Sequence, residues 1–157
     1  MPKRSAGLLL YRRTGDGTEV LLVHPGGPYW AKKDDGAWSV PKGEYQEGED
    51  PFEAALREFL EELGTEPPHT SAALPLGEQR QPGGKLVIVW AMEGDLDVST
   101  IVSNKFEMEW PPRSGRTAEF PEVDRAAWFG LESATRKMLR GQITFLDRLV
   151  AAVSGRG

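Results

Sequence analysis

Three glutamates in one short segment, Glu58, Glu61 and Glu62, could together hold a divalent cation. Their spacing of i, i+3 and i+4 makes them neighbours on one face of a helix. Each pair of like charges at this spacing destabilises a bare helix by about 0.2–0.5 kcal/mol, so the arrangement has a cost. Carboxylate oxygens suit a hard cation such as Mg²⁺ or Mn²⁺. The alternative interpretation is an acidic helix face that simply contacts solvent.

Residues around the glutamates favour the metal site. Arg57 is placed to pair with Glu53 and Glu61, which neutralises only part of the acidic face. Glu49 lies where it could reach back to Arg57. Gly43, which has no side chain, can bring a bare backbone carbonyl close to the helix. A guanidinium, a further carboxylate and a backbone oxygen would thus surround the three glutamates.

The segment has the signals of a helix from Pro51 to Leu63. Asp50 is a good N-cap, Pro51 suits the first turn and Glu53 completes a capping box. Gly64 is a typical left-handed stop. An apolar stripe at helical spacing should face a core; it consists of Phe52, Ala55, Leu56, Phe59 and Leu63.

The stretch from Gly43 to Thr65 resembles the Nudix box: Gly, five residues, Glu, seven residues, then Arg-Glu-bulky-x-Glu-Glu-x-Gly-bulky. The specified residues are present as Gly43, Glu49, Arg57, Glu58, Glu61, Glu62 and Gly64. Phe59 and Thr65 depart from the usual aliphatic and bulky apolar residues, but both occupy packing positions. So many specified positions make this a strong motif.

The resemblance implies an α/β fold, a Nudix-like α/β/α sandwich with a mixed β-sheet, and a single domain over residues 1–157. It implies that Glu58, Glu61, Glu62 and the Gly43 carbonyl hold Mg²⁺ or Mn²⁺. It also implies that Arg57 and Glu49 orient these ligands. In addition, Lys42 is assigned to phosphate and Trp110 to substrate; an ordinary surface lysine is the alternative for Lys42.

The remaining elements are consistent with such a sandwich. Strands are expected near residues 6–11, 19–24, 38–40, 74–81, 85–93, 104–110 and 123–129, and helices at 131–139 and 144–153. Residues 111–121 are predicted to form a polar loop. The loop over residues 29–36 is interpreted equally well as solvated surface or as part of a substrate rim.

The general base could come from outside the helix, because a carboxylate bound to a cation has a lowered pKa. The strand at 104–110 alternates, with Phe106, Met108 and Trp110 on one face and Glu107 and Glu109 on the other. If the apolar face packs on the core, Glu107 or Glu109 faces either solvent or the cleft with the metals. Otherwise Glu61 would itself serve as the base.

Composition bounds the class of protein. The chain has 157 residues, 39% of them hydrophobic, and a net charge of −5, which argues against a nucleic-acid polymer as partner. It has no cysteine, which excludes disulfides and thiolate metal sites, and only His24 and His69 as histidines. Both are interpreted as ordinary strand or loop residues. The absence of a long apolar run predicts no membrane segment and a cytoplasmic protein.

By resemblance, the expected activity is metal-dependent hydrolysis of a phosphoanhydride in a nucleoside diphosphate linked to another group. Nucleoside triphosphates and dinucleoside polyphosphates both remain open as substrates, with the protein a monomer or homodimer. The alternative is a non-catalytic Nudix-like domain that senses nucleotides or binds protein, but such domains are expected to lose ligand glutamates. An isoprenoid diphosphate isomerase would want a catalytic cysteine. Downstream, Gln81-Pro82-Gly83 matches no substrate signature of the family squarely.

Overall fold

A mixed β-sheet forms the centre of the computed structural model, which describes residues 3–68 and 72–154. The strand order is β4-β5-β1-β2-β8, with β3 also paired to β1. The bounds are β1 (Arg4–Thr14), β2 (Gly17–Pro25), β3 (Lys42–Glu44), β4 (Leu74–Arg80), β5 (Leu86–Glu93) and β8 (Val123–Gly130). The β1–β5 pair is parallel and the other pairs are antiparallel. The predicted mixed sheet is confirmed.

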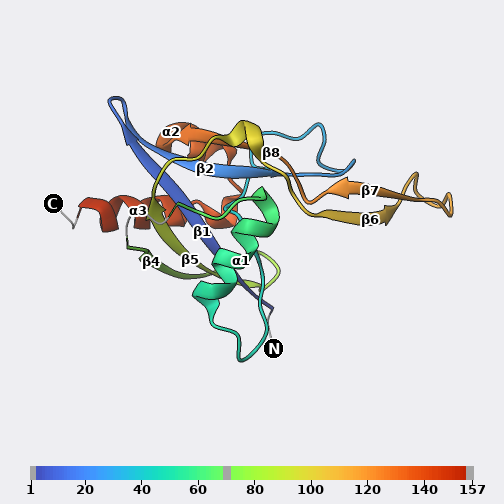
Figure 1. Cartoon of the computed structure of the whole chain (residues 1–157), viewed down its shortest axis with the longest axis horizontal. Coiled ribbons are helices and arrows are strands. Elements are labelled where there is room, and N and C mark those ends of the chain that lie inside the picture. Colours follow the sequence, from blue (N-terminus) through green and yellow to red (C-terminus); the bar gives the residue numbers. More distant parts are fainter. Residues whose placement is uncertain (1–2, 69–71, 155–157) are drawn as a thin grey trace.

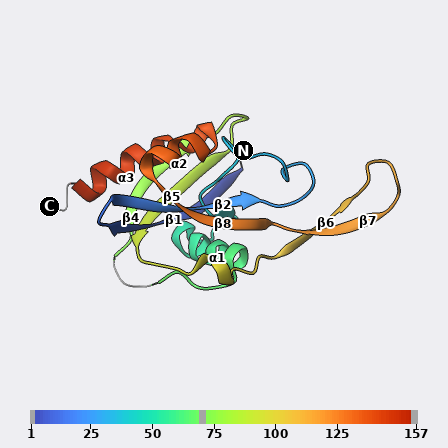
Figure 2. The same cartoon turned by 90° about the horizontal axis from the view of Figure 1, so that it is seen from above.

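Helices cover both faces of this sheet. Figure 2 shows α1 (Pro51–Leu63) on one face and α2 (Leu131–Lys137) and α3 (Thr144–Ser154) on the other. Two short 3₁₀ helices, η1 (Val98–Thr100) and η2 (Arg140–Gln142), lie in the connections. Each face has its own apolar core: Leu8, Leu21 and Phe59 belong to the core on the α1 side, and Leu9 and Phe145 to the other. The predicted three-layer sandwich is therefore confirmed.

The predicted limits of α1 are confirmed by its caps. The Asp50 side chain accepts the backbone N–H of Glu53 at 3.0 Å, which satisfies a donor that the helix leaves free. Gly64 ends the helix in a left-handed conformation with φ of 75°, and its N–H donates to the Leu60 carbonyl. The buried residues are Ala54, Ala55, Phe59 and Leu63. Their packing on the sheet also brings Glu58 and Glu62, which flank the buried stripe, next to β3.

A separate hairpin of β6 (Lys105–Glu109) and β7 (Thr117–Pro121) projects from the body of the molecule (Figure 1). The alternation predicted for residues 104–110 is confirmed, with Phe106 and Met108 half-buried between exposed neighbours. The prediction of a polar loop over 111–121 is wrong, because Thr117–Pro121 pairs with β6. This short strand within a polar segment is stabilised by its partner strand, which local composition does not reveal.

The strand predicted at residues 38–40 is also misplaced. Trp38 and Ser39 form only isolated bridges, to Met138 and Val23, and the strand lies slightly later as β3. The other predicted strands and both C-terminal helices are confirmed. His24 lies in β2 as expected, whereas His69 lies outside the described residues. Within residues 3–68 and 72–154, no helix is long and apolar enough to span a membrane.

Candidate active site

Gly43 of strand β3 packs directly against α1. Gly43 pairs with Ala6 of β1, which fixes its place at the sheet edge. A Cβ atom at this position would lie 2.0 Å from Oε2 of Glu58, far inside van der Waals contact. Any residue larger than glycine would displace the carboxylate. The predicted approach of the Gly43 backbone to the helix is therefore present in the structure.

Glu62 lies beside the same strand, where its carboxylate Oε1 accepts the backbone N–H of Lys42 at 3.3 Å. Burial raises the pKa of Glu62 to about 8, although the backbone and charge of Lys42 oppose this rise, and the charges of Glu58 and Glu122 add to it. Burial and the charge of Glu61 likewise raise the pKa of Glu58, with Arg57 opposing. Both carboxylates therefore lie in surroundings that disfavour their negative charge.

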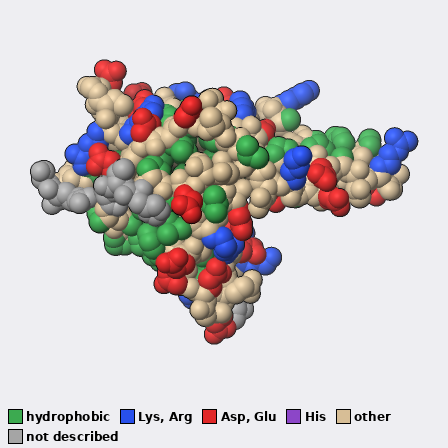
Figure 3. Space-filling view, in the orientation of Figure 1, with side chains coloured by type: hydrophobic (Ala, Val, Ile, Leu, Met, Phe, Trp, Pro, Cys, Tyr) green, Lys and Arg blue, Asp and Glu red, His purple; other side chains and the backbone are tan. Residues whose placement is uncertain are grey.

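Arg57 connects Glu49, in the loop before α1, with Glu58 and Glu61 on the helix. The predicted pairs with Glu49 and Glu61 are present, whereas Glu53 is not a partner of Arg57 among the described residues. The Nε of Arg57 lies 3.2 Å from Oε2 of Glu49, and its Nη1 lies 2.8 Å from Oε1 of Glu58 and 3.5 Å from Oε1 of Glu61. The Nη2 atom also approaches both carboxylate oxygens of Glu49. A planar guanidinium can hold several carboxylates in fixed directions. Figure 3 shows the resulting mixture of acidic and basic side chains over α1.

The glutamate cluster, defined as Glu58, Glu61 and Glu62, fits a weakly held Mg²⁺ or Mn²⁺. Among the residues that the structure describes, no three or more carboxylate or imidazole side chains converge on a position that could hold a metal ion, so these side chains form no closed cage. A closed cage is not required, because Mg²⁺ usually keeps several waters and takes one or two carboxylates. The Glu58 carboxylate against the bare Gly43 backbone, with the raised pKa of Glu62, matches that need.

Glu107 and Glu109 are not brought to the glutamate cluster. Both lie in β6, and this strand leads away from α1 toward the hairpin tip (Figure 1). Glu109 accepts the backbone N–H groups of Arg113 and Gly115 at 3.0 and 3.1 Å. It thus stabilises the turn of the hairpin. Of the two alternatives for this acidic face, solvent and the cleft with the metals, these contacts favour solvent, because both carboxylates are exposed and, among the described residues, neither pairs with the glutamate cluster.

Glu122, which the sequence did not single out, lies near the cluster instead. Its negative charge contributes to the raised pKa of both Glu58 and Glu62. The Asn104 carbonyl accepts the Glu122 N–H, and the Asn104 N–H donates to the Glu61 carbonyl. This contact depends on the closure of a hairpin from residue 104 to residue 122. The only local signal was an acidic residue just before a predicted strand.

The two residues assigned to substrate lie apart. Lys42 is half-buried in β3, where burial and the charge of Lys85 lower its pKa while Glu62 opposes them. The Trp110 ring lies beyond β6, edge-to-face on Tyr29 with 5.5 Å between ring centroids. Lys42 therefore borders the glutamate cluster, whereas Trp110 belongs to the surface between the hairpin and the loop after β2.

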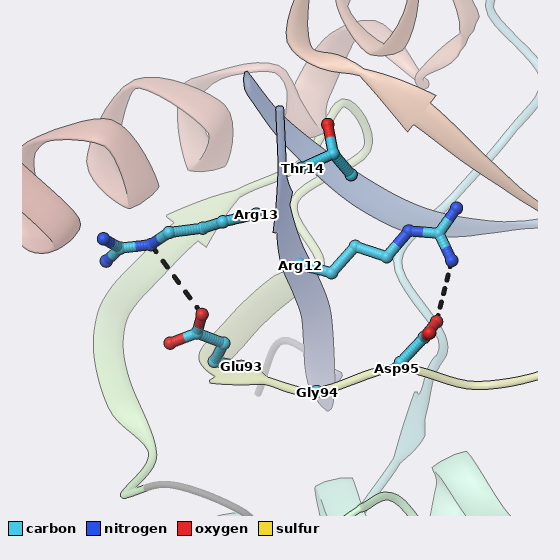
Figure 4. A pocket seen from close by; sticks show the side chains of 6 residues that line it. All are labelled: Arg12, Arg13, Thr14, Glu93, Gly94 and Asp95. Carbon is cyan, nitrogen blue, oxygen red and sulfur yellow. Dashed lines mark hydrogen bonds and ion pairs between the residues drawn. The ribbon is translucent and has the colours of Figure 1, made fainter. Parts of the chain in front are cut away.

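Hollows open at several places on the described surface. One, at the far end of β1, is lined by Arg12, Arg13, Glu93 and Asp95, whose charges pair with one another (Figure 4). A second, of about 660 Å³, lies beside Glu49 and the chain leading into α1. The third, of about 320 Å³, lies between the residues after β2 and the hairpin, with Glu122 in its wall. The second hollow includes Glu49, a partner of Arg57, and the third includes Glu122, whose charge acts on Glu58 and Glu62.

Comparison with known proteins agrees with this geometry. The NUDIX domain family model matches residues 1–149. An RNA pyrophosphohydrolase of Brucella anthropi is 31% identical over 136 residues, spanning 69% of this chain and 71% of that protein. The crystal structure of a C. elegans Ap4A hydrolase binary complex has a TM-score of 0.65 at 24% identity, over 98% of both chains. A mutT/nudix family protein from Listeria innocua has a TM-score of 0.63 at 17% identity, over 99% of this chain and 97% of that one.

The two solved structures share the fold of this chain, and the family model extends over almost all of it. The motif from Gly43 to Thr65 lies in the structure as a helix, a strand and the loop between them, with its charged residues in mutual contact. Sequence motif, family model and fold all lead to one assignment: this chain belongs to the Nudix hydrolase family.

Proposed function

We propose that this protein hydrolyses a phosphoanhydride bond in a nucleoside diphosphate linked to another group, using Mg²⁺ or Mn²⁺ at the glutamate cluster. The observation that supports this most directly is the contact between Gly43 and Glu58, where a Cβ would lie 2.0 Å from the carboxylate. Residues 1–157 would form one catalytic domain. The predicted cytoplasmic location stays a prediction.

The residues of the site have distinct roles in this proposal. Glu58, Glu61, Glu62 and the Gly43 carbonyl would hold the cation, which polarises phosphoryl oxygens and activates water when bound. Arg57 and Glu49 keep the carboxylates in place through the contacts described above. Lys42, at the edge of the cluster, would contact phosphate. Polyphosphate and carboxylates repel each other, so substrate binding requires the cation.

Glu122 is the best placed carboxylate outside the helix to accept a proton from water. It replaces Glu107 and Glu109 in this role, because its charge acts on Glu58 and Glu62. Glu61 is the alternative base within the helix. Proton transfer to a positioned carboxylate typically contributes about 10²–10⁴-fold to the rate. Removal of the true base should therefore lower kcat much more than a change in packing would.

A screen of nucleotides would identify the substrate. Purified protein with Mg²⁺ is assayed for release of phosphate or pyrophosphate from nucleoside triphosphates, dinucleoside polyphosphates and nucleoside diphosphates with other groups. A 5′-triphosphorylated oligonucleotide is added because a relative is an RNA pyrophosphohydrolase. The net charge of −5 favours the small nucleotides over the polymer.

Metal removal and two variants complete the test. Excess EDTA should abolish turnover, and Glu61→Gln and Glu62→Gln should each lower kcat by about 10²-fold or more, which is about 3 kcal/mol. Glu66→Gln, an exposed carboxylate beyond the helix, is the matched control and should match the unmodified protein. Full turnover in EDTA would show that hydrolysis does not depend on a divalent metal. Binding of nucleotides without turnover would support a non-catalytic sensing domain.

A further inference from the structure

The connection from β5 to β6 ends in a short segment, residues 101–104, that is hydrogen-bonded to the C-terminal end of α1. The Val102 N–H donates to the Leu63 carbonyl and the Asn104 N–H donates to the Glu61 carbonyl, each at 3.0 Å. Carbonyls in the last turn of a helix have no partner within the helix. The 101–104 segment supplies these partners, so it has a fixed place relative to the helix that carries the glutamate cluster.

Gly64 allows the 101–104 segment to come this close to the helix. A Cβ atom on Gly64 would lie 2.4 Å from the Val102 carbonyl oxygen, which is far inside van der Waals contact. Glycine is therefore required at this position for two reasons, because its φ of 75° ends the helix and because it has no side chain to displace the segment. The last glycine of the motif thus belongs to the contact between α1 and this segment.

The backbone around Glu122 is fixed by three hydrogen bonds. The Glu122 N–H donates to the Asn104 carbonyl at 2.7 Å, and the Glu122 carbonyl accepts the Gly26 N–H at 3.0 Å. The N–H of the next residue, Val123, donates to Oγ of Ser103 at 2.9 Å. Two of these partners are backbone groups, whereas the third is the side chain of Ser103. The hydroxyl of Ser103 is therefore the contact that a substitution can remove.

The same hydroxyl has a second partner in the 101–104 segment. It donates to the Asn104 carbonyl at 2.9 Å, and this is the oxygen that also accepts the Glu122 N–H. Because the Asn104 N–H is bonded to Glu61, one short segment connects α1 on one side with Glu122 and Val123 on the other. The place of Glu122 relative to α1 is thus set at the base of the β6–β7 hairpin.

We propose that Ser103 is a positioning residue, which holds Glu122 in place relative to α1 through the Val123 N–H and the Asn104 carbonyl. The inference rests on the proposed function, in which Glu122 accepts a proton from water, and adds how this carboxylate is placed. Glu122 is exposed, so burial in a core does not fix it. A catalytic group that is misplaced by about 1 Å can lose about 10²-fold in rate. The two hydrogen bonds of Ser103 supply the restraint that burial does not.

A matched pair of variants tests the hydroxyl. With Mg²⁺ and the nucleotide that is hydrolysed fastest in the screen, Ser103→Ala should lower kcat by about tenfold or more and leave KM within about twofold, because the base does not bind substrate. Ser103→Thr, which keeps a hydroxyl, should have a kcat within about threefold of the unmodified protein. Ser99→Ala is the control, since it removes a hydroxyl that donates to Asp97 at 2.6 Å in the same connection, and it should leave kcat unchanged.

A double-mutant cycle separates the placement of Glu122 from a general loss of stability. If Ser103 acts through Glu122, Ser103→Ala should lower kcat by about tenfold in the unmodified protein but by less than about twofold in the Glu122→Gln background. A merely structural role would lower kcat by the same factor in both backgrounds. Equal factors would therefore overturn the proposal, and so would a Ser103→Thr variant that is as slow as Ser103→Ala.

Amide hydrogen exchange tests the same contact without turnover. In the metal-free protein, Ser103→Ala should speed exchange of the Val123 amide by roughly 2–10-fold, because this amide loses its acceptor, while the Val102 amide keeps its rate. If no phosphoanhydride is hydrolysed but the Val123 amide exchanges faster, the placement of Glu122 by Ser103 is supported and the proposed function fails. If turnover occurs and Ser103→Ala has the kcat of the unmodified protein, the positioning role is overturned and the proposed function stands.

Discussion

Glu62 is the carboxylate of the site with the largest electrostatic cost. Burial raises its pKa from 4.5 to about 8 despite the opposing backbone N–H and charge of Lys42. In the folded protein it therefore binds a proton at a pH where the unfolded chain has released it. This proton binding stabilises the metal-free protein at low pH, and the contribution is lost as the pH rises from about 4.5 through about 8.

Glu62→Gln should consequently stabilise the metal-free protein at high pH. At pH 8.5 its free energy of unfolding should exceed that of the unmodified protein by at least about 1 kcal/mol, since each unit of pKa shift corresponds to about 1.4 kcal/mol. The difference should shrink toward zero near pH 4.5. Urea unfolding in EDTA across this range measures it, with Glu66→Gln as the control. If the difference in free energy of unfolding did not vary with pH, the buried charge of Glu62 would not destabilise the fold.

Gly43→Ala tests the contact between strand and helix. Its Cβ would displace the Glu58 carboxylate, so affinity for Mn²⁺ should fall by about 10–100-fold. Calorimetric titration with Mn²⁺ gives this value directly. Gly130→Ala is a suitable control, because a Cβ there meets no atom within 4 Å and the backbone φ of −63° is ordinary. Unchanged Mn²⁺ affinity in Gly43→Ala would place the cation elsewhere.

Arg57→Lys should behave as a damaging substitution despite the conserved charge. A lysine cannot reproduce the contacts of Nε and Nη1 with Glu49 and Glu58, because an ammonium is a point charge. Metal affinity and kcat should each fall by about tenfold or more. The exposed Arg140→Lys is the matched control. If the two variants have the same kcat and Mn²⁺ affinity, Arg57 has no orienting role.

At the scale of elements, the sequence predicted those that local residues determine. The helix limits followed from Asp50, Pro51 and Gly64, and each strand with a continuous apolar run was placed correctly. The misplaced strand at 38–40 depends on residues far along the chain, and the missed β7 depends on its pairing with β6. The same reason explains the candidate site. The motif residues were predicted from their spacing, while Glu122 approaches them only when the hairpin closes.

Substitutions on the hairpin separate its structural role from catalysis. Glu109→Ala should speed amide hydrogen exchange at Arg113 and Gly115, which lose their acceptors, while kcat stays within about twofold. Glu107→Gln should also leave kcat unchanged. Glu122→Gln should lower kcat by about 10²-fold or more and flatten the acid limb of the pH–rate profile. A small effect of Glu122→Gln on kcat would assign the base to Glu61.

For the whole molecule, the proposed metal binding would be thermodynamically linked to folding. The glutamate cluster exists only when α1 is packed on the sheet beside β3, so the unfolded chain has no comparable site. A bound cation also relieves the repulsion among Glu58, Glu61 and Glu62. Divalent metal should therefore stabilise the entire fold, not only the helix.

Melting temperature measures this linkage. Mg²⁺ or Mn²⁺ at about 100 times its dissociation constant should add about 2.7 kcal/mol, which is a rise in Tm of roughly 5–10 °C for a domain of this size. Glu58→Gln should lose most of the rise. Sodium chloride at equal ionic strength controls for screening. A Tm that is indifferent to divalent metal in the unmodified protein would contradict the site.

The projecting β6–β7 hairpin gives the protein a natural place for a spectroscopic label. Its tip lies away from α1 and the central sheet (Figure 1), and the chain contains no cysteine. Ser114→Cys would introduce a single thiol, so a dye could be attached at one atom without any background removal. Because Phe106 and Met108 of the hairpin line the hollow after β2, the rotational freedom of the dye would measure how firmly the hairpin is held to the rest of the protein.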